Sequence, residues 1–220
     1  MKKLLTLIGL GLVAAGGAFA QAWPSKPGTL LVPVAAGGST DLIARTLQPK
    51  LQEKLGGTFV VENKGGAGGT VGATQAKRAA PDGYTVFVSS LGPFVIGPHL
   101  MKNLAYDPLK DFDYVTVAVQ APNVLVVPVN SPHKSVADVL AFHKANPGKM
   151  SFASSGNGSS DHLTAEMFWS QTGTSGLHIP YKGGGPAMSD ILGGQVDASF
   201  QNINAIIPHH KAGKLRALAI

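Results

Sequence analysis

The sequence contains no cysteine, so disulfide bonds contribute nothing to the stability of the folded chain. Charged residues are also scarce, at 14% of 220 residues, whereas 28 residues are glycine. With 44% hydrophobic residues, this composition excludes a disordered chain and indicates a compact, loop-rich protein. The hydrophobic core therefore has to supply the stability that disulfide bonds give to many exported proteins.

Long apolar runs and clusters of basic residues are missing as well. Beyond the N-terminus, no run approaches the roughly 18 apolar residues that a transmembrane helix requires. The 18 Lys and Arg residues outnumber the 12 Asp and Glu residues and give a net charge of +6, but they are scattered along the chain. Nucleic-acid-binding proteins concentrate such residues in a patch, so we expect no nucleic acid partner. The mild positive balance favours an acidic small molecule instead.

The N-terminus has the features of an export signal. Lys2 and Lys3 precede an apolar segment over residues 4–15, and Ala18-Phe19-Ala20 matches the A-x-A cleavage pattern. We therefore expect residues 1–20 to be a cleavable signal peptide. A short N-terminal membrane anchor is the alternative, whereas a lipid anchor is excluded because no cysteine follows the apolar segment.

Apolar runs alternate with helical patterns along the rest of the chain, which predicts an α/β protein. In the first part we expect strands at 29–34, 58–63 and 84–90, with helices at 40–57 and 70–80 between them. This order predicts a parallel sheet with helices on both faces.

An irregular, proline-containing connector over 92–112 follows, and then two expected strands at 114–120 and 123–129. A second α/β series begins at the helix after Ser135. We expect its strands at 150–154, 177–181, 197–202 and 215–220.

These patterns divide the chain after the signal peptide into two domains. We expect domain 1 over residues 21–120, domain 2 over 121–208, and the start of a return to domain 1 over 209–220. The chain stops inside an apolar strand at Ile220, and a natural C-terminus more often ends in polar residues. We therefore expect that the sequence is truncated and that domain 1 is incomplete.

Three glycine-rich turns each join the end of a strand to the start of a helix. They are "PVAAGGSTD" (33–41), "SSGNGSSDH" (154–162) and "YKGGGPAMSD" (181–190). A helix N-terminus offers free N–H groups and a partial positive charge, and glycine lets a ligand approach the backbone. Because ligands of open α/β sheets bind at the carboxyl ends of the strands, these turns predict a site for a carboxylate. The alternative is that their hydroxyl groups serve only as helix caps.

Other functions fit the sequence less well. Ser160, Asp161 and His162 are consecutive at a helix start, where neighbouring side chains point about 100° apart and cannot form a Ser-His-Asp relay. There is no G-x-S-x-G nucleophile elbow and no phosphate-binding G-x-x-x-x-G-K-[ST] motif. We therefore expect no catalytic residue, no metal and no cofactor. The loop "GGAGGT" (65–70) either lines a cleft or is a plain flexible loop.

Read as a set, several stretches resemble the periplasmic receptors of tripartite tricarboxylate transporters, the Bug or TctC family. The matching stretches follow one another in order through nearly the whole chain after the signal peptide: "WPSKPGTLLVPVAAGGSTDLIAR", "VVENKGGAGGTVGA", "PDGYT", "LAYDPLKDF", "PNVLVV", "SFASSGNGSSDHLTAEMF", "HIPYKGGGPAMSDILGGQVD" and "HHKAGKLRALA".

The resemblance implies a type II periplasmic-binding-protein fold, with two α/β domains around a ligand cleft. It implies a monomer that binds a dicarboxylate, tricarboxylate or aromatic acid, closes on it and delivers it to the permease subunits in the membrane. It further implies that turns from opposite domains clamp the ligand. The candidate binding residues are Ala36, Gly38, Ser39 and Thr40 in one turn, Ser155, Gly156, Gly158, Ser159 and Ser160 in the other, and Ser89, Ser90 and Tyr181 nearby.

Two departures from the family pattern bear on binding. Family members often carry Asp-Asn where this chain has Gln201-Asn202, and a glutamine cannot pair with the amino group of a ligand as a carboxylate can. Gln201 is therefore a candidate binding residue that disfavours an amino-acid ligand. Family members are also about a hundred residues longer. A secreted serine hydrolase and a truncated fragment that binds nothing remain the alternative interpretations.

Overall fold

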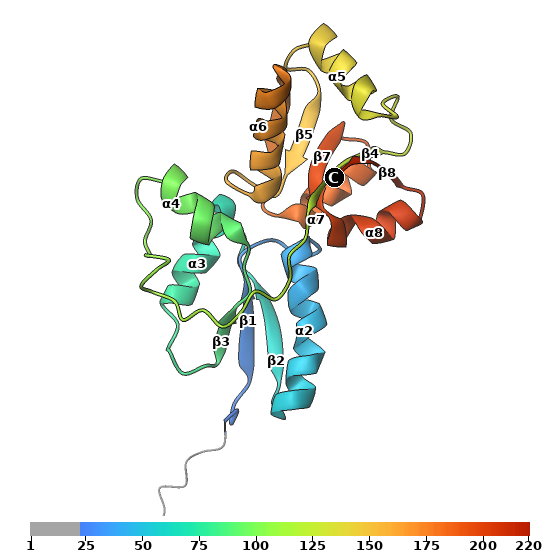
Figure 1. The fold of residues 1–220 in the computed structure, drawn as a ribbon. Helices are drawn as coiled ribbons and strands as arrows, with labels where there is room; N and C mark the ends of the chain where they lie inside the picture. Colours follow the sequence, from blue (N-terminus) through green and yellow to red (C-terminus); the bar gives the residue numbers. More distant parts are fainter. Residues whose placement is uncertain (1–22) are drawn as a thin grey trace, which may run out of the picture.

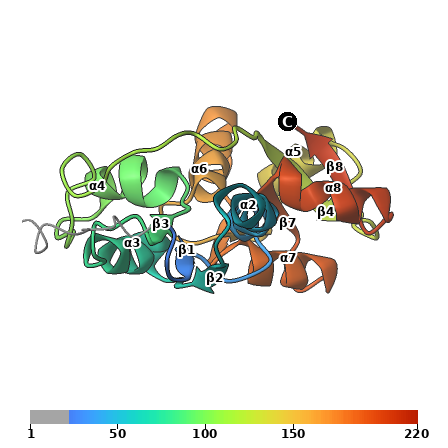
Figure 2. The ribbon, with the colours of Figure 1, turned by 90° about the horizontal axis from the view of Figure 1, so that it is seen from below.

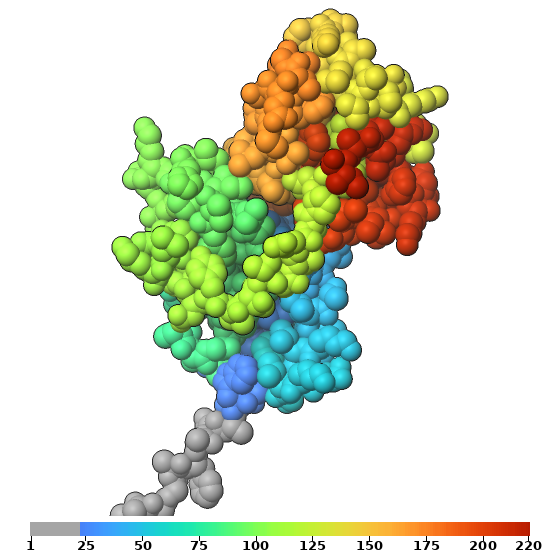
Figure 3. All heavy atoms as spheres, in the orientation of Figure 1, coloured from blue at the N-terminus to red at the C-terminus, as the bar shows by residue number. Residues whose placement is uncertain are grey.

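The computed structural model describes residues 23–220, which form two α/β units (Figure 1). The predicted signal peptide lies outside the described residues. In the space-filling view the two units form separate lobes, and the chain between them runs over the surface (Figure 3).

The first unit contains a parallel sheet with the strand order β2-β1-β3. Its strands are β1 (Gly28–Val32), β2 (Phe59–Asn63) and β3 (Thr85–Phe87). Helices α2 (Ser39–Leu55) and α3 (Thr70–Lys77) lie on opposite sides of this sheet (Figure 2). The βαβαβ order predicted from the sequence is therefore confirmed.

Short helical turns border this sheet at the end that faces the second unit. They are η1 (Ala67–Gly69), η2 (Gly92–Ile96) and α4 (Gly97–Leu100). The last two lie in the connector that the sequence predicted to be irregular. Pro93 and Pro98 each occupy one of the first positions of a turn, where proline costs no backbone hydrogen bond.

The second unit contains a five-stranded mixed sheet with the order β6-β5-β7-β4-β8. Strand β5 is parallel to β6 and β7, whereas β4 is antiparallel to β7 and β8. The strands are β4 (Asn123–Pro128), β5 (Ser151–Ser154), β6 (Leu177–Pro180), β7 (Ala198–Asn202) and β8 (Leu215–Ala219). The helices are α5 (Val136–Ala145), α6 (Ser160–Thr172), α7 (Gly184–Leu192) and α8 (Ile203–Lys211).

Strand β4 shows why this sheet is covered on both faces. Alternate residues of a strand point to opposite sides, so Val124 and Val126 join one core cluster while Leu125 and Val127 join the other. The first cluster includes Ile191 of α7, and the second includes Trp169 of α6. A strand buried on both faces reads as a continuous apolar run, as "VLVV" does here.

The expected strand over 114–120 is wrong. This segment is extended but has no strand partner, and it carries the chain from the first unit to the second (Figure 3). Val115 is 88% exposed and Val117 is 73% exposed. An alternating apolar pattern favours a strand, but a strand forms only where a neighbouring backbone supplies hydrogen bonds.

The segment 209–220 also differs from the expectation that it begins a return to the first unit. It contains the end of α8 and strand β8, which pairs with β4 in the second sheet. Leu215 is buried in the core of that unit, so apolar burial holds this segment there.

Candidate functional site

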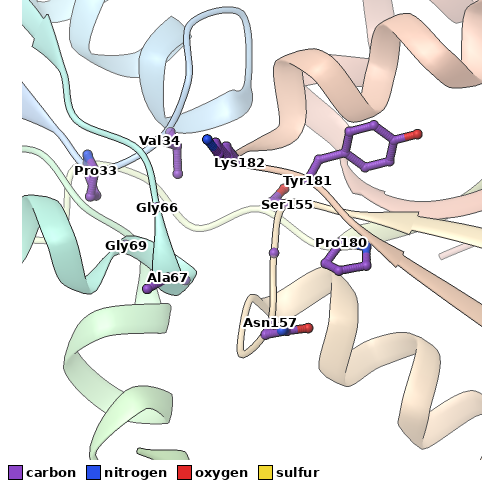
Figure 4. Close-up of a pocket in the computed structure, with 12 residues that line it drawn as sticks. Pro33, Val34, Gly66, Ala67, Gly69, Ser155, Asn157, Pro180, Tyr181 and Lys182 are labelled. Carbon is purple, nitrogen blue, oxygen red and sulfur yellow. The ribbon is translucent and has the colours of Figure 1, made fainter. Parts of the chain in front are cut away.

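A pocket of about 170 Å³ lies between the two units, at the carboxyl ends of β1 and β6 (Figure 4). An engineered cavity of about 150 Å³ holds benzene, so a pocket of this size suits a small organic molecule. Four short segments that follow strands line it: Pro33, Val34, Gly66, Ala67, Gly68, Gly69, Ser155, Gly156, Asn157, Pro180, Tyr181 and Lys182.

The loop 66–69 forms one wall of the pocket. Ala67 has a φ of 46°, and it is the single non-glycine residue with positive φ in residues 23–220. Three glycines around it, Gly66, Gly68 and Gly69, also have positive φ. Within the same residues, the N–H groups of Ala67 and Gly68 donate to no protein acceptor. Left-handed backbone with free N–H groups is a common feature of anion-binding loops. Of the two readings of "GGAGGT", the structure supports the lining of a cleft.

The opposite wall is the loop 155–157 (Figure 4). Its shape depends on hydrogen bonds to Asp161 of α6. One carboxylate oxygen of Asp161 accepts hydrogen bonds from both the N–H and the Oγ of Ser155, each at 2.7 Å. Burial raises the pKa of Asp161 above its usual value. The carboxylate points back into its own loop, so its charge is turned away from the pocket.

The turn 33–41 is built by a similar device. Asp41 in the first turn of α2 accepts from the Gly37 N–H, from Arg45 Nε and from Asn63 Nδ2, each at 2.9 Å. Burial would raise the pKa of Asp41, but these hydrogen bonds and the Arg45 charge lower it below its usual value. In both turns a buried aspartate accepts hydrogen bonds from its own turn and so fixes the shape of that turn.

The turns 33–41 and 181–190 meet each other behind the pocket. The Ala35 N–H donates to the Lys182 carbonyl oxygen at 2.9 Å. Ser39 Oγ donates to Asn202 Oδ1 at 3.0 Å and accepts from Asn204 Nδ2 at 3.2 Å. Hydrogen bonds therefore join the two units on this side.

Of the predicted binding residues, the structure places Ser155, Gly156 and Tyr181 in the pocket lining. Tyr181 lines it with its backbone, because its hydroxyl group donates to Asp190 Oδ2 and its ring points away (Figure 4). Burial, together with Asp190, raises the pKa of Tyr181 to about 12. The phenol is therefore a structural group of the second unit.

The other predicted residues lie outside this lining. Ala36, Gly38, Ser39 and Thr40 lie in the turn that meets the second unit behind the pocket, and Ser89 and Ser90 follow β3. Ser159 is the N-cap of α6, where its Oγ accepts from the His162 N–H, and Ser160 begins the helix. The Gly158 N–H donates to His162 Nδ1 at 3.2 Å.

Gln201 is buried behind the loop rather than in the pocket. Its Nε2 donates to Asp161 Oδ2 at 3.3 Å and to Ser199 Oγ at 3.0 Å. A second carboxylate at this position would face that of Asp161. The glutamine therefore supports Asp161 and does not touch the space between the walls.

Lys182 carries the single formal charge among the lining residues. Neither Lys182 nor Asn157 was among the candidate binding residues, whereas the loop 65–70 was expected either to line a cleft or to be flexible. A basic residue directly after a strand, beside a glycine-rich turn, was the available signal.

Among residues 23–220, no group of three or more His, Cys, Asp or Glu side chains is arranged to hold a metal ion. In that same part of the chain, no helix has both the length and the apolar character to cross a bilayer.

The polar residues in and around the turn 154–162 do not form the Ser-His-acid triad of a serine hydrolase. Ser154 Oγ lies 2.6 Å from His178 Nε2, but Ser154 is buried and also accepts from the Gly156 N–H. The ring of His178 stacks on that of His162, with 4.1 Å between the ring centroids. No carboxylate bonds to His178 within the described residues, so a Ser-His-acid triad is absent there.

The chain is similar to known bacterial proteins in sequence and in structure. BugT of Bordetella pertussis is 41% identical over the whole chain, which covers 69% of that protein. Among solved structures, R. palustris Rpa4515 with adipate is 34% identical with a TM-score of 0.86. MatC (Rpa3494) from Rhodopseudomonas palustris with bound malate is 32% identical with a TM-score of 0.83. The chain covers 66% of each of these two structures, and they cover 90% and 89% of it.

The structure of the periplasmic binding protein BugD is also similar, at 39% identity with a TM-score of 0.79, and the fold of these structures is the one seen here. The chain spans about two thirds of the length of these relatives. The family model for the tripartite tricarboxylate transporter family receptor, TctC, matches residues 43–220. The chain therefore belongs to the tripartite tricarboxylate transporter receptor family.

Proposed function

We propose that this protein captures a small organic carboxylate in the pocket between its two units and delivers it to a membrane permease of the tripartite tricarboxylate type. The observation that carries the proposal is the chemistry of the lining. One lysine and free backbone N–H groups surround the pocket, and no acidic side chain lines it.

Recognition in this pocket is assigned to the backbone and to Lys182. The free N–H groups of Ala67, Gly68 and Asn157 are donors for carboxylate oxygens. The ammonium group of Lys182, which belongs to the second unit, supplies the positive charge that balances the negative charge of the ligand. Ser155 and Gly156 shape the wall that the second unit contributes. The carboxylate of Asp161 is kept away from the ligand because it is hydrogen-bonded to Ser155.

Ligand class and location follow from the same reasoning. Relatives of this chain are solved with adipate and with malate, which are dicarboxylates of different length. We propose a dicarboxylate, tricarboxylate or aromatic acid for this chain, bound by a monomer in the periplasm after removal of the segment 1–20. The N-terminal charge and apolar pattern supports export, and the family assignment supports the permease partner.

A thermal-shift screen of the purified chain tests the proposal. Malate, adipate, citrate and benzoate are compared with matched neutral amides, and titration calorimetry follows for any acid that raises the melting temperature. A ligand that binds only the folded state stabilises it by about 2.7 kcal/mol at a hundredfold excess over its Kd. A shift with an acid and none with its amide supports the proposal, whereas a cooperative melt that no acid moves contradicts it.

A further inference from the structure

The pocket is bordered by two contacts between the units, and these differ in kind. Behind the pocket, the turns 33–41 and 181–190 are joined by hydrogen bonds, among them that from the Ala35 N–H to the Lys182 oxygen. In front of it, the loop 66–69 touches the loop 155–158 with no hydrogen bond between them in residues 23–220. The rear contact is therefore the stronger hinge, and the front contact can separate.

The front contact is a backbone-to-backbone approach centred on Gly68. A Cβ atom built at Gly68 would lie 2.3 Å from the carbonyl oxygen of Asn157. Real Cβ atoms do not approach other atoms below about 3.0 Å, and a backbone oxygen cannot rotate away as a flexible side chain can. Gly68 and Asn157 both line the pocket, so this contact closes its front.

The surrounding residues reinforce the same contact. A Cβ atom at Gly92 would lie 2.9 Å from the Gly68 oxygen, and one at Gly156 would lie 3.9 Å from the Gly68 Cα. The Gly68 loop is thus held between a first-unit neighbour and the second unit. It cannot retreat to make room for a side chain.

We infer that Gly68 is an affinity-determining residue of this receptor, because its missing side chain lets the two walls of the pocket meet at the Asn157 carbonyl. Any side chain at this position holds the front of the pocket open. A bound acid would then lose contact with one wall and would leave faster. The effect on affinity rests on the proposed function, because it requires a bound acid. The separation of the two walls by a side chain at position 68 does not.

The chain offers a matched control for this position. Gly68 has a φ of 63° and Gly173 a φ of 62°, so an alanine suffers the same backbone strain at either site. A Cβ atom at Gly173 meets nothing within 4 Å, and Gly173 ends α6 far from the pocket lining. The difference between Gly68→Ala and Gly173→Ala therefore isolates the steric contact.

The first measurement is the distance between the units without ligand. Because the chain has no cysteine, Lys102→Cys and Met167→Cys introduce the only two sites for spin labels, both exposed and one on each unit. Pulsed electron paramagnetic resonance should give a longer or broader distance distribution with Gly68→Ala than with the parent or Gly173→Ala. An unchanged distribution in a folded Gly68→Ala chain would overturn the inference, whether or not the acid is identified.

The second measurement uses malate and adipate as probes. The expected result is a Kd at least about tenfold higher for Gly68→Ala, mostly through faster dissociation, and less than about twofold higher for Gly173→Ala. If the parent chain binds a probe and both variants bind it equally well, the inference is wrong while the proposed function stands. If the parent binds neither probe, the failure belongs to the proposed function, and the distance measurement still decides the inference.

Discussion

The carboxylate of Asp161 accepts two hydrogen bonds from Ser155, one from the N–H and one from the Oγ, each at 2.7 Å. This pair fixes the loop 155–157 that forms one wall of the pocket. It also removes the hydroxyl of Ser155 from the donors available to a ligand. In the proposed site this wall therefore offers a ligand backbone N–H groups, and its shape is set by Asp161, which is not among the lining residues.

We expect Asp161→Ala to destabilise the chain by about 1–3 kcal/mol, since it leaves the two partly buried donors of Ser155 without their acceptor. Acid binding should weaken with it because the wall loses its shape. Urea denaturation measures the first effect and calorimetry the second. Asp113→Ala is the control, because Asp113 is exposed and makes no ion pair in the described residues. Equal stability of the two variants would refute this role of Asp161.

Lys182→Met should weaken the binding of an acid without reducing stability by more than about 0.5 kcal/mol, since the lysine is exposed and has no ion-pair partner in residues 23–220. Affinity should fall by about 2–30-fold, and most for ligands with two carboxylates. Lys149→Met is the matched control in the same unit, outside the pocket. Calorimetry at two salt concentrations checks the result, and equal affinity of both variants would contradict it.

Tyr181→Phe should lower stability by about 1 kcal/mol because it removes the hydrogen bond to Asp190 inside the second unit. Affinity for an acid should be unchanged, since the ring points away from the pocket (Figure 4). Thermal denaturation and calorimetry on one preparation separate the two effects. A marked loss of affinity with normal stability would show that the phenol contacts the ligand after all.

Stability should fall as the pH drops from about 6.5 to about 4. Burial, with His162 beside it, lowers the pKa of His178 to about 4. An unfolded histidine takes up its proton near pH 6.5, so within this window the unfolded state binds more protons and gains stability relative to the fold. Above about pH 6.5 the histidine is neutral in both states, so its stabilising contribution is fully present.

His178→Gln separates this effect from other titrations, because a glutamine side chain can still bond to Ser154 and cannot take up a proton. The variant should show a smaller loss of stability between pH 6.5 and 4 than the parent. Asp161 acts in the opposite direction, since its raised pKa favours the fold at low pH, but it is the same in both proteins. Urea denaturation at several pH values gives the two slopes, and parallel slopes would disprove the role of His178.

Local patterns in the sequence determined most of the secondary structure and the fold class. Alternating apolar runs and capped helices are local, so the strands from 28 to 87 and from 123 to 219 and the six longer helices were predictable. The segment 114–120 was not, because its pattern is that of a strand but a strand also requires a partner backbone, which no local pattern supplies. The pairing of β8 with β4 was hidden for the same reason.

The candidate site, like the fold, was only partly predictable from the sequence. Glycine-rich turns before helices pointed to the right edge of the sheets, and Ser155, Gly156 and Tyr181 lie in the pocket that the structure forms there. Only the tertiary structure decided which turn faces the pocket and which meets the other unit, because that depends on contacts between residues far apart in the sequence. The sequence thus determined glycine-rich turns at the ends of strands, and the packing of the two units determined that Gly68, Asn157 and Lys182 line one pocket between them.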